Sequence, residues 1–345
     1  MLSFLFQPNH TSDLKILYIF KHLFALFVLL LAFFSHVSTS AQNLDKFVLA
    51  GWSKPITEIT NLLVEPDKGF FKSRGIELAY LPGAGGGDAI RNVLTGQADI
   101  AFTDPGSYFA ALNKGEKLKI VYDIYPQNVF NVVSLKSSNI LTPMDLKGKK
   151  IGVYSLSSGT LQNLQLLLHM SGLKDSDVTI VVTGLLNFAP LMQGQVDATA
   201  ATDTGLLIGR EKGLGAVNVI EINKYINVSS DIFVVSEETF LKKKESIRKF
   251  LMAYRDSMQW MIQSPQEAAQ LAVKFALDGQ NPSINFEVIK LRNTSSVSLL
   301  TDKKGLGAFD PLIFQKAADT YQKMGLIQNN LDISKFSSLE LIPKP

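Results

Sequence analysis

The sequence has no cysteine among its 345 residues. This absence excludes disulfide bonds, thiolate metal sites, thiol nucleophiles and a lipid-modified N-terminal cysteine. Histidine is also scarce, since the chain has four and only His169 lies beyond residue 41. A lone histidine in the apolar stretch LLLHMSG favours a structural role, so we predict no metal site and no cofactor. The fold must be held by an apolar core, which a chain of this length can form.

An excess of one charge is likewise missing. The 34 basic and 31 acidic residues give a formal net charge of +3. No block of basic residues alternates with aromatic residues in the way that a nucleic-acid-binding surface requires. The run Lys242–Lys244 is followed by Glu245, which is typical of a solvated helix face. The composition is that of an ordinary globular protein, and the length favours two lobes over one.

Long apolar runs are limited to one near the N-terminus. Lys15 and Lys21 precede the apolar run Leu23–Phe34, and the small and polar residues Ser35–Ser40 lead to Ala41. A basic segment, a short apolar helix and a small-residue exit are typical of a secretory signal peptide, here residues 1–41. The run is short for a membrane span, so an uncleaved anchor remains the alternative. We expect an exported, periplasmic protein.

Strands and helices are predicted to alternate along the exported part. Lys46–Gly51, Ile76–Leu81 and Ile100–Phe102 have the composition of short strands, and helical spacing of apolar residues separates them. Asp88 is the expected N-cap of one of these helices. The same alternation of predicted strands and helices begins again after Pro143. This pattern is the signature of open α/β sheets.

An internal sequence repeat indicates two similar lobes. The segment VLTGQADIAFTD recurs as LMQGQVDATAATD. Asp99 matches Asp197, and with one inserted residue Asp104 matches Asp203. We therefore expect two related α/β lobes that face each other.

The chain is expected to cross between the lobes twice. Val129–Leu135 is a predicted strand followed by the connector Lys136–Thr142, and Ile232–Val235 is the predicted return strand before a long helical tail on the first lobe. Two such connections form a hinge beside a cleft. The predicted boundaries are signal peptide 1–41, lobe 1 at 42–137 and 230–345, and lobe 2 at 138–229.

Several segments, taken in order, resemble one family. They are GFFKSRGIELAY, LTGQADIAFTDPG, MDLKGKKIGV followed by SSGT, GQVDA, and SPQEAAQLAVKF. Over about residues 45–340 the chain resembles the extracytoplasmic substrate-binding proteins for nitrate, sulfonate, taurine and thiamine-pyrimidine uptake. The resemblance implies a type II periplasmic-binding-protein fold and an ABC transporter permease as partner. The cysteine-rich motif of the enzymes that make the thiamine pyrimidine is missing from this sequence.

The strongest candidate for ligand binding is the loop that opens a helix after the strand at 151–154. Ligands of open α/β sheets lie beyond the carboxyl ends of the strands. Amides at a helix start, with nearby hydroxyl groups, suit a carboxylate, sulfonate or phosphate. The alternative is a well-capped helix without a ligand. The candidate residues are Ser157, Ser158, Gly159 and Thr160.

Other loops add aromatic and polar candidates. Trp52, with Ser53, follows the first strand and either stacks on a flat ligand or packs under a helix. Tyr125 and Asn128 are placed at the cleft rim. The glycine-rich loop Gly83–Gly87 lacks the Lys-Ser/Thr of a nucleotide-binding loop, so we expect it to be a flexible loop at the cleft mouth.

Asp104 and Asp203 are the candidate acids, one from each lobe. Either can accept a hydrogen bond from an amine or a ring N–H. The alternative for Asp104 is a helix N-cap, because Pro105 follows it.

These observations favour a monomeric solute receptor of an ABC importer that touches the membrane only through the transporter or an uncleaved signal. Trp52 and the two aspartates favour a flat, amine-bearing ring such as a thiamine-type pyrimidine. A sulfonate, taurine or nitrate remains the alternative. An exported enzyme that uses Asp104 and Asp203 for acid–base chemistry is the alternative of another class, and we predict that the protein is not an enzyme.

Overall fold

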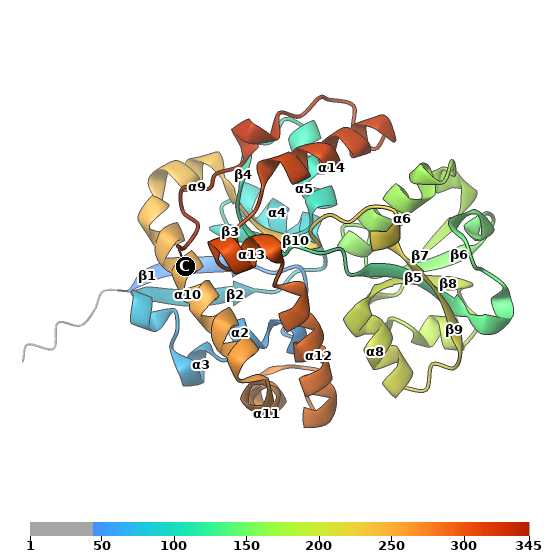
Figure 1. The fold of residues 1–345 in the computed structure, drawn as a ribbon, viewed down its shortest axis with the longest axis horizontal. Coiled ribbons are helices and arrows are strands. Elements are labelled where there is room, and N and C mark those ends of the chain that lie inside the picture. Colours follow the sequence, from blue (N-terminus) through green and yellow to red (C-terminus); the bar gives the residue numbers. More distant parts are fainter. Residues whose placement is uncertain (1–43, 345) are drawn as a thin grey trace, which may run out of the picture. The chain divides into compact units, whose positions relative to one another are not determined.

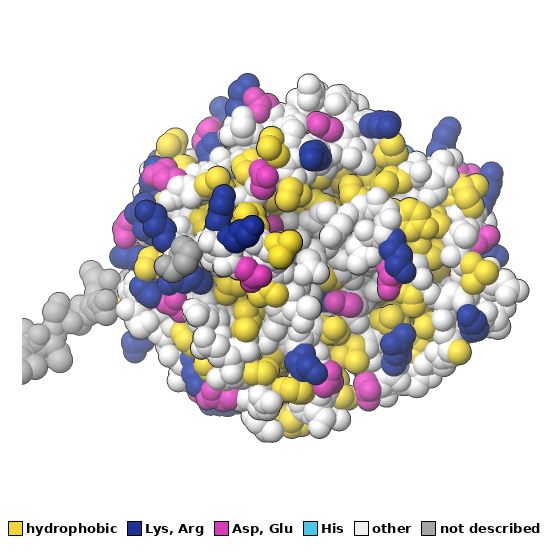
Figure 2. All heavy atoms as spheres, viewed as in Figure 1, with side chains coloured by type: hydrophobic (Ala, Val, Ile, Leu, Met, Phe, Trp, Pro, Cys, Tyr) yellow, Lys and Arg dark blue, Asp and Glu magenta, His cyan; other side chains and the backbone are white. Residues whose placement is uncertain are grey.

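The computed structural model describes residues 44–344, and these form two lobes, each built around a five-stranded sheet (Figure 1). The predicted signal peptide lies outside the described residues. Between residues 44 and 344, no helix is both long enough and apolar enough to cross a membrane. Lysine, arginine and acidic side chains are interspersed over the face seen in Figure 2.

The sheet of lobe 1 has the order β2-β1-β3-β10-β4. β1 is parallel to β2 and β3, and β10 runs antiparallel to both of its neighbours. The central strand β3 (IAFT) is buried at every position, as its apolar sequence predicts. The strands are β1 Asp45–Ala50, β2 Ile76–Leu81, β3 Ile100–Thr103, β4 Leu118–Tyr125 and β10 Asp231–Ser236.

The sheet of lobe 2 repeats this arrangement in the order β7-β6-β8-β5-β9. β6 is parallel to β7 and β8, and β5 is antiparallel to both of its neighbours. In each sheet, the strand that is fourth in this order follows directly after a strand of the other lobe in the sequence. This strand is β10 in lobe 1, which follows β9, and β5 in lobe 2, which follows β4. The strands are β5 Phe130–Leu135, β6 Lys150–Val153, β7 Thr179–Val182, β8 Ala198–Thr202 and β9 Val217–Glu221.

The first crossing between lobes lies earlier than predicted. Residues 130–135, expected in lobe 1, pair with β8 and β9 of lobe 2. The chain therefore crosses at 126–129 and not after residue 137. The strand at 129–135 was recognisable from its apolar pattern, but that pattern fits either sheet. The return crossing falls between β9 and β10, and the predicted return strand is β10.

Helices cover both faces of each sheet. Those of lobe 1 that precede the first crossing are α2 Thr60–Leu63, α3 Glu65–Lys68, α4 Gly86–Leu94 and α5 Pro105–Asn113. Those of lobe 2 are α6 Gly159–Met170, α7 Ala189–Met192 and α8 Asp203–Glu211. The predicted helical tail consists of α9 Glu237–Lys242, α10 Lys244–Gln263, α11 Pro265–Phe275, α12 Pro282–Ser295, α13 Leu299–Lys304 and α14 Pro311–Lys323.

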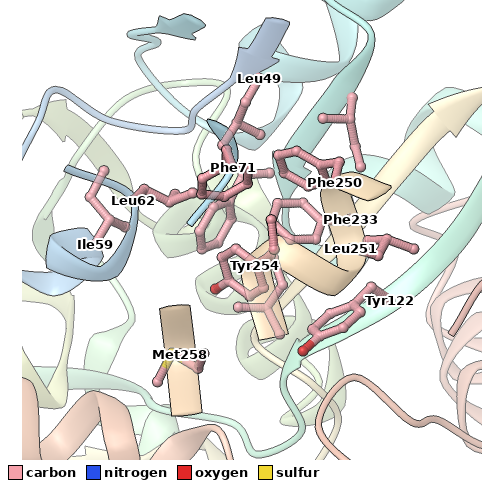
Figure 3. Close-up of a cluster of buried hydrophobic side chains, with 14 of the residues drawn as sticks. Leu49, Ile59, Leu62, Phe71, Tyr122, Phe233, Phe250, Leu251, Tyr254 and Met258 are labelled. Carbon is pink, nitrogen blue, oxygen red and sulfur yellow. The ribbon is translucent and has the colours of Figure 1, made fainter. Parts of the chain in front are cut away.

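The tail is anchored on lobe 1 by an aromatic core between α10 and the sheet (Figure 3). The Phe233 and Tyr254 rings meet edge to face with centroids 4.7 Å apart, and Phe47 stacks on Phe250 at 5.0 Å. Such pairs contribute about 0.5–1.5 kcal/mol each beyond the burial of their area. The helical spacing of Phe250 and Tyr254 predicted this buried face.

Asp99 and Asp197, the aspartates of the repeated segment, form equivalent hydrogen bonds. The Asp99 carboxylate accepts a hydrogen bond from the Val48 amide at 2.8 Å, and the Asp99 amide donates to the Val48 carbonyl. Asp197 forms the same pair of bonds with Lys150 of β6. Each aspartate thus ties the start of its strand to the neighbouring parallel strand, which explains why Gly-Gln-x-Asp occurs in both lobes.

The second predicted correspondence is wrong. Asp104 is the N-cap of α5 and accepts from the Ser107 amide at 2.8 Å. Its counterpart is Thr202, the N-cap of α8, which accepts from the Gly205 amide at 3.2 Å. Asp203 is one position further on, so no inserted residue is needed. Threonine and aspartate both cap helices, so a comparison that matches only identical residues does not pair Asp104 with Thr202.

The expected cap at Asp88 is also wrong. Helix α4 starts at Gly86 with Gly85 as its N-cap. Asp88 lies in the first turn, where its carboxylate accepts from the Ala84 amide at 3.1 Å. The helix begins three residues earlier than predicted because Gly85 adopts a conformation that other residues rarely reach, with a φ of +136°.

Candidate ligand-binding cleft

A cavity of about 590 Å³ lies between the lobes, beyond the carboxyl ends of the parallel strands. Its size is within the range of ligand sites in proteins, roughly 300–1,000 Å³. The two lobes contribute different chemistry. Lobe 1 supplies Trp52, Glu58, Asp104, Asp231 and Arg292. Lobe 2 supplies mainly apolar and hydroxyl groups, including Phe130, Tyr154, Ser158, Gly159, Thr160 and Phe188.

Two aromatic rings meet across the cleft. Trp52 from lobe 1 and Tyr154 from lobe 2 approach edge to face with ring centroids 6.4 Å apart. On its other side Trp52 contacts Phe102 at 6.4 Å, which fixes the indole against the sheet. The buried indole N–H has no hydrogen-bond partner within residues 44–344. Trp52 therefore presents an aromatic surface at the cavity wall, while its indole N–H is enclosed.

The start of α6 forms the opposite wall. Ser158 is the N-cap, and its hydroxyl donates to the Ser155 carbonyl at 2.7 Å. The Thr160 hydroxyl oxygen accepts from the Tyr154 amide at 3.0 Å. These hydroxyls hold the loop in shape, and the first amides of α6, from Gly159 onward, have no partner inside the helix. The wall thus offers backbone N–H groups more than free hydroxyls.

Asp104 is buried under the cavity floor as a helix cap. Its two carboxylate oxygens accept from the Ser107 amide and, at 2.7 Å, from the Ser107 hydroxyl. Burial raises the pKa of Asp104, and the bonds from Ser107 oppose this shift. A side chain at Gly86 would collide with this carboxyl group, so the glycine is needed for the approach of α4. The capping interpretation of Asp104 is the one that the geometry supports.

Arg292 of α12 forms a buried ion cluster that spans the cleft. Its side chain is 1% exposed, with Nε 3.0 Å from the Glu58 carboxylate of lobe 1, although the angle of this contact falls outside hydrogen-bond geometry. Its Nη2 donates to the Asp203 carboxylate and, at 3.0 Å, to the Thr204 hydroxyl, both on α8 of lobe 2. The Thr204 hydroxyl in turn donates to Glu58 at 2.6 Å.

Burial and the contacts within this ion cluster shift the pKa values of Arg292 and Glu58. Burial lowers the pKa of Arg292, but the Asp203 and Glu58 carboxylates outweigh it, and the pKa is raised above its usual range. Burial raises the pKa of Glu58 despite the nearby guanidinium group. The Arg292 guanidinium also lies 5.3 Å from the centre of the Tyr125 ring. Arg292 is therefore a permanent cation that joins the two lobes.

A second contact between the lobes involves the glycine-rich loop. The Gly87 amide donates to the Ser157 carbonyl at 2.9 Å, and the hydroxyls of Ser155 and Ser157 both donate to the Ala84 carbonyl. A Cβ at Gly85 would lie 2.4 Å from the Ser157 carbonyl oxygen, so only glycine allows this approach. The loop lies at the cleft as predicted, and it is held there by lobe 2.

Half of the predicted site residues line the cavity, namely Trp52, Asp104, Ser158, Gly159 and Thr160. The others serve the framework. Ser53 is fully buried with its hydroxyl on the Lys54 carbonyl, and Tyr125 lies under Arg292. Asn128 donates to Asn163, Ser157 joins the lobes, and Asp203 pairs with Arg292.

The sequence reasoning missed Glu58, Asp231, Arg292, Phe130 and Tyr154. Tyr154 and Phe130 lie at the ends of predicted strands, so their position was a usable signal. Asp231 immediately precedes the predicted return strand, and an acid at that place was also a usable signal. Glu58 and Arg292 lie in helical segments with no local feature that separates them from surface charges.

His169 lies outside the cavity lining. One of its ring nitrogens is 2.8 Å from the Met324 carbonyl oxygen, and the other is 3.1 Å from the Asp175 carboxylate. Over the part of the chain that the structure covers, no three His, Asp or Glu side chains are grouped so that they could hold a metal ion.

Comparison with known families gives a clear match. The family model described as NMT1/THI5 like matches residues 56–268, more than half of the chain. The chain belongs to the NMT1/THI5-like family. The matched span includes most of both lobes and all the cavity residues discussed above except Trp52 and Arg292.

Individual relatives of this family member are distant. It is 23% identical to the riboflavin-binding protein RibY of Chloroflexus aurantiacus, over 87% of each chain. It is 25% identical to the 4-amino-5-hydroxymethyl-2-methylpyrimidine phosphate synthase THI12 of Saccharomyces cerevisiae, over 68% of this chain and 72% of the yeast protein.

The fold is that of periplasmic binding proteins. The alkanesulfonate-binding protein SsuA of Xanthomonas axonopodis pv. citri, solved with bound MOPS, superposes with a TM-score of 0.69 at 15% identity, covering 85% of this chain and 98% of that one. The predicted two-lobed type II periplasmic-binding-protein fold is therefore confirmed. At this identity the likeness concerns the fold and carries no statement about the ligand.

Proposed function

We propose that this NMT1/THI5-like protein is a solute receptor that binds a flat heteroaromatic molecule between its lobes. The observation that carries the proposal is the cavity of about 590 Å³ whose walls come from both lobes. A ligand that touches both walls stabilises the closed arrangement, and binding energy is thereby converted into a change of lobe position. A thiamine-type pyrimidine ring with substituents fits the aromatic walls and the size.

The charge of the lining supports a neutral or cationic ligand over an organic anion. Glu58, Asp104 and Asp231 all face or underlie the cavity, and the buried cation Arg292 is already paired with two carboxylates. A sulfonate would further disfavour the ionisation of these carboxyl groups, whose pKa values burial already raises, and Arg292 is not free to pair with it.

An organic anion is the second candidate, favoured by one observation. The N-terminus of α6, a twelve-residue helix, opens on the cavity at Gly159. Helix N-termini carry a partial positive charge and bind anionic groups. Taurine or an alkanesulfonate would use this wall and leave the acids of lobe 1 without a role.

We further propose that the protein has no enzymatic activity of its own, although the yeast relative is a synthase. The acid pair considered for catalysis is not available in this arrangement, because Asp203 pairs with Arg292 and Asp104 caps α5. An incubation of purified protein with a bound ligand, followed by mass spectrometry, tests this point. Recovery of the ligand unchanged supports a receptor, and its conversion supports an enzyme.

The two tryptophans of the chain make a direct binding test possible. Trp260 lies on α10, where its indole N–H donates to Glu267 at 2.9 Å, and it is outside the cavity lining. In Trp260→Phe the remaining tryptophan is Trp52. We expect heteroaromatic ligands to quench the fluorescence of this variant and to raise its melting temperature.

Trp52→Ala should weaken binding by about 10–100-fold, because about 1.5–3 kcal/mol of aromatic contact is lost. Trp260→Phe should bind like the unmodified protein, which makes it the matched control. Equal affinity of Trp52→Ala and Trp260→Phe in calorimetry would exclude the aromatic wall as the binding surface.

Delivery to an ABC transporter permease after export to the periplasm completes the proposal. The predicted cleavage after Ala41 gives a mature protein that begins at Gln42. Mass spectrometry of the protein released from the periplasm should show this N-terminus. Retention of Leu23–Phe34 in a membrane fraction would indicate an anchored form instead.

A further inference from the structure

Among the buried acids that line the cleft, Asp231 differs from Glu58 and Asp104. It is the first residue of β10, and because β10 runs antiparallel to β3, it lies at the edge of the sheet where the parallel strands end. Its side chain lines the cavity, yet the residue is only 9% exposed. No group within residues 44–344 donates a hydrogen bond to its carboxyl oxygens.

The neighbouring acids are already in use. Asp104 is held by Ser107 and Asp203 by Arg292, while Glu58 accepts from the Thr204 hydroxyl. The Asp231 oxygens are not among the enclosed, unpaired polar atoms of residues 44–344, and the residue lines the cavity, so its carboxyl group is open to the cavity. The carboxyl of Asp231 is therefore available for a ligand in the cavity.

The surroundings set the charge of this carboxyl group. Asp104 after β3, Glu58 on the 3-10 turn Thr57–Ile59, and Asp123 on β4 disfavour its ionised form, whereas Arg292 on α12 favours it. Burial, and after it the Asp104 carboxyl, raise the pKa of Asp231 well above its usual range. A neutral carboxylic acid has one oxygen that accepts a hydrogen bond and one O–H that donates.

We propose that Asp231 is the recognition group for the ligand, and that the ligand presents to it an amidine-type edge, a ring nitrogen next to an amino group. The Asp231 O–H donates to the ring nitrogen, and its second oxygen accepts from the amino group. A protonated ring paired with the ionised acid gives the same two bonds. This inference rests on the proposed receptor function and names the substrate class of that site.

The test compares two probes that differ only at this edge. The first is 4-amino-5-hydroxymethyl-2-methylpyrimidine, and the second is the analogue in which a hydrogen atom replaces the amino group. We expect the unmodified protein to prefer the amino probe by at least about 10-fold, since a good bidentate pair discriminates by about 1–3 kcal/mol.

Two variants separate recognition from structure. Asp231→Leu should reduce the preference to about twofold or less, whereas Asp231→Asn, whose amide also donates and accepts, should retain most of it. A purely structural role for Asp231 would lower the affinity for both probes equally and leave their ratio unchanged, which would overturn the inference. The ratio is measured on folded protein only, as judged by circular dichroism.

Riboflavin and taurine serve as additional probes that separate this inference from the proposed function. If riboflavin binds without being consumed while neither pyrimidine binds, the heteroaromatic receptor function stands and the amidine-type edge is wrong. If only taurine binds, the protein is a receptor but the heteroaromatic ligand class is also wrong. If the probes are converted to products, the receptor function itself fails.

Discussion

The two lobes share a framework and differ in what they bring to the cleft. Asp99 and Asp197 tie equivalent strands together, and Asp104 and Thr202 cap equivalent helices. Lobe 1, however, carries almost all of the buried charge at the cavity, and lobe 2 offers aromatic rings, hydroxyls and a helix start. Framework positions thus tolerate a change between aspartate and threonine, whereas the charged wall is specific to one lobe.

The largest effect is expected from breaking the charged link between the lobes. Arg292→Met leaves Glu58 and Asp203 without their cation, and the loss of one partner from a buried ion pair costs about 3–5 kcal/mol. Urea unfolding should show this loss. Arg248, which pairs with Glu245 on an exposed helix surface, is the control, and Arg248→Met should change stability by less than about 0.5 kcal/mol.

The double variant Arg292→Met with Glu58→Met sharpens this result. It removes both charges, so it should recover part of the stability lost in Arg292→Met alone. If the single variant is as stable as the unmodified protein, the cluster does not hold the lobes together.

The next effect concerns pH and the buried acids of lobe 1. Burial raises the pKa of Asp123 to about 8, against a hydrogen bond from Ser229 that lowers it. Because the folded state then holds a proton that the unfolded state releases, stability should fall as pH rises from about 4 to about 8, by up to about 1.4 kcal/mol per pH unit from this group.

Asp123→Asn should flatten that slope, as measured by urea unfolding at several pH values. The exposed Asp145 is the control, because hydrogen bonds from the Thr142 and Leu141 amides lower its pKa and its titration is complete below this window. A profile for Asp123→Asn that is parallel to that of the unmodified protein would show that Asp123 is ionised throughout.

A smaller effect separates the two matched aspartates. Asp99 carries an additional ion pair with Lys243 at 2.7 Å, and its side chain is 12% exposed, whereas Asp197 is exposed. Asp99→Ala should cost about 2 kcal/mol and Asp197→Ala about 1 kcal/mol in chemical denaturation, because burial raises the cost of an unpaired amide. The reverse order would mean that the shared motif is not equivalent in the two lobes.

The smallest effect tests the matched helix caps. Asp104→Ala and Thr202→Ala should each cost about 1 kcal/mol, the usual contribution of an N-cap. Asp104→Asn keeps an oxygen that accepts from Ser107 and should be close to neutral. A cost for Asp104→Asn equal to that of Asp104→Ala would show that the charge, and not the cap, matters at this position.

The sequence by itself determined the elements that depend on local spacing. The alternation of strands and helices, the apolar face of α10 and the repeated Gly-Gln-x-Asp are periodic or contiguous, so they could be predicted without coordinates. The same holds for Trp52 and the start of α6, because ligand sites in such sheets follow strand ends.

Only the tertiary structure decided which groups are free to bind. The pairing of residues 130–135 with lobe 2, the bond from Arg292 to a residue 89 positions away, and the unpartnered carboxyl of Asp231 all depend on contacts between distant segments. Burial and hydrogen-bond partners decide whether a carboxyl group acts as a helix cap, an ion-pair partner or a recognition group. The residues next to it in the sequence determine neither its burial nor its partners.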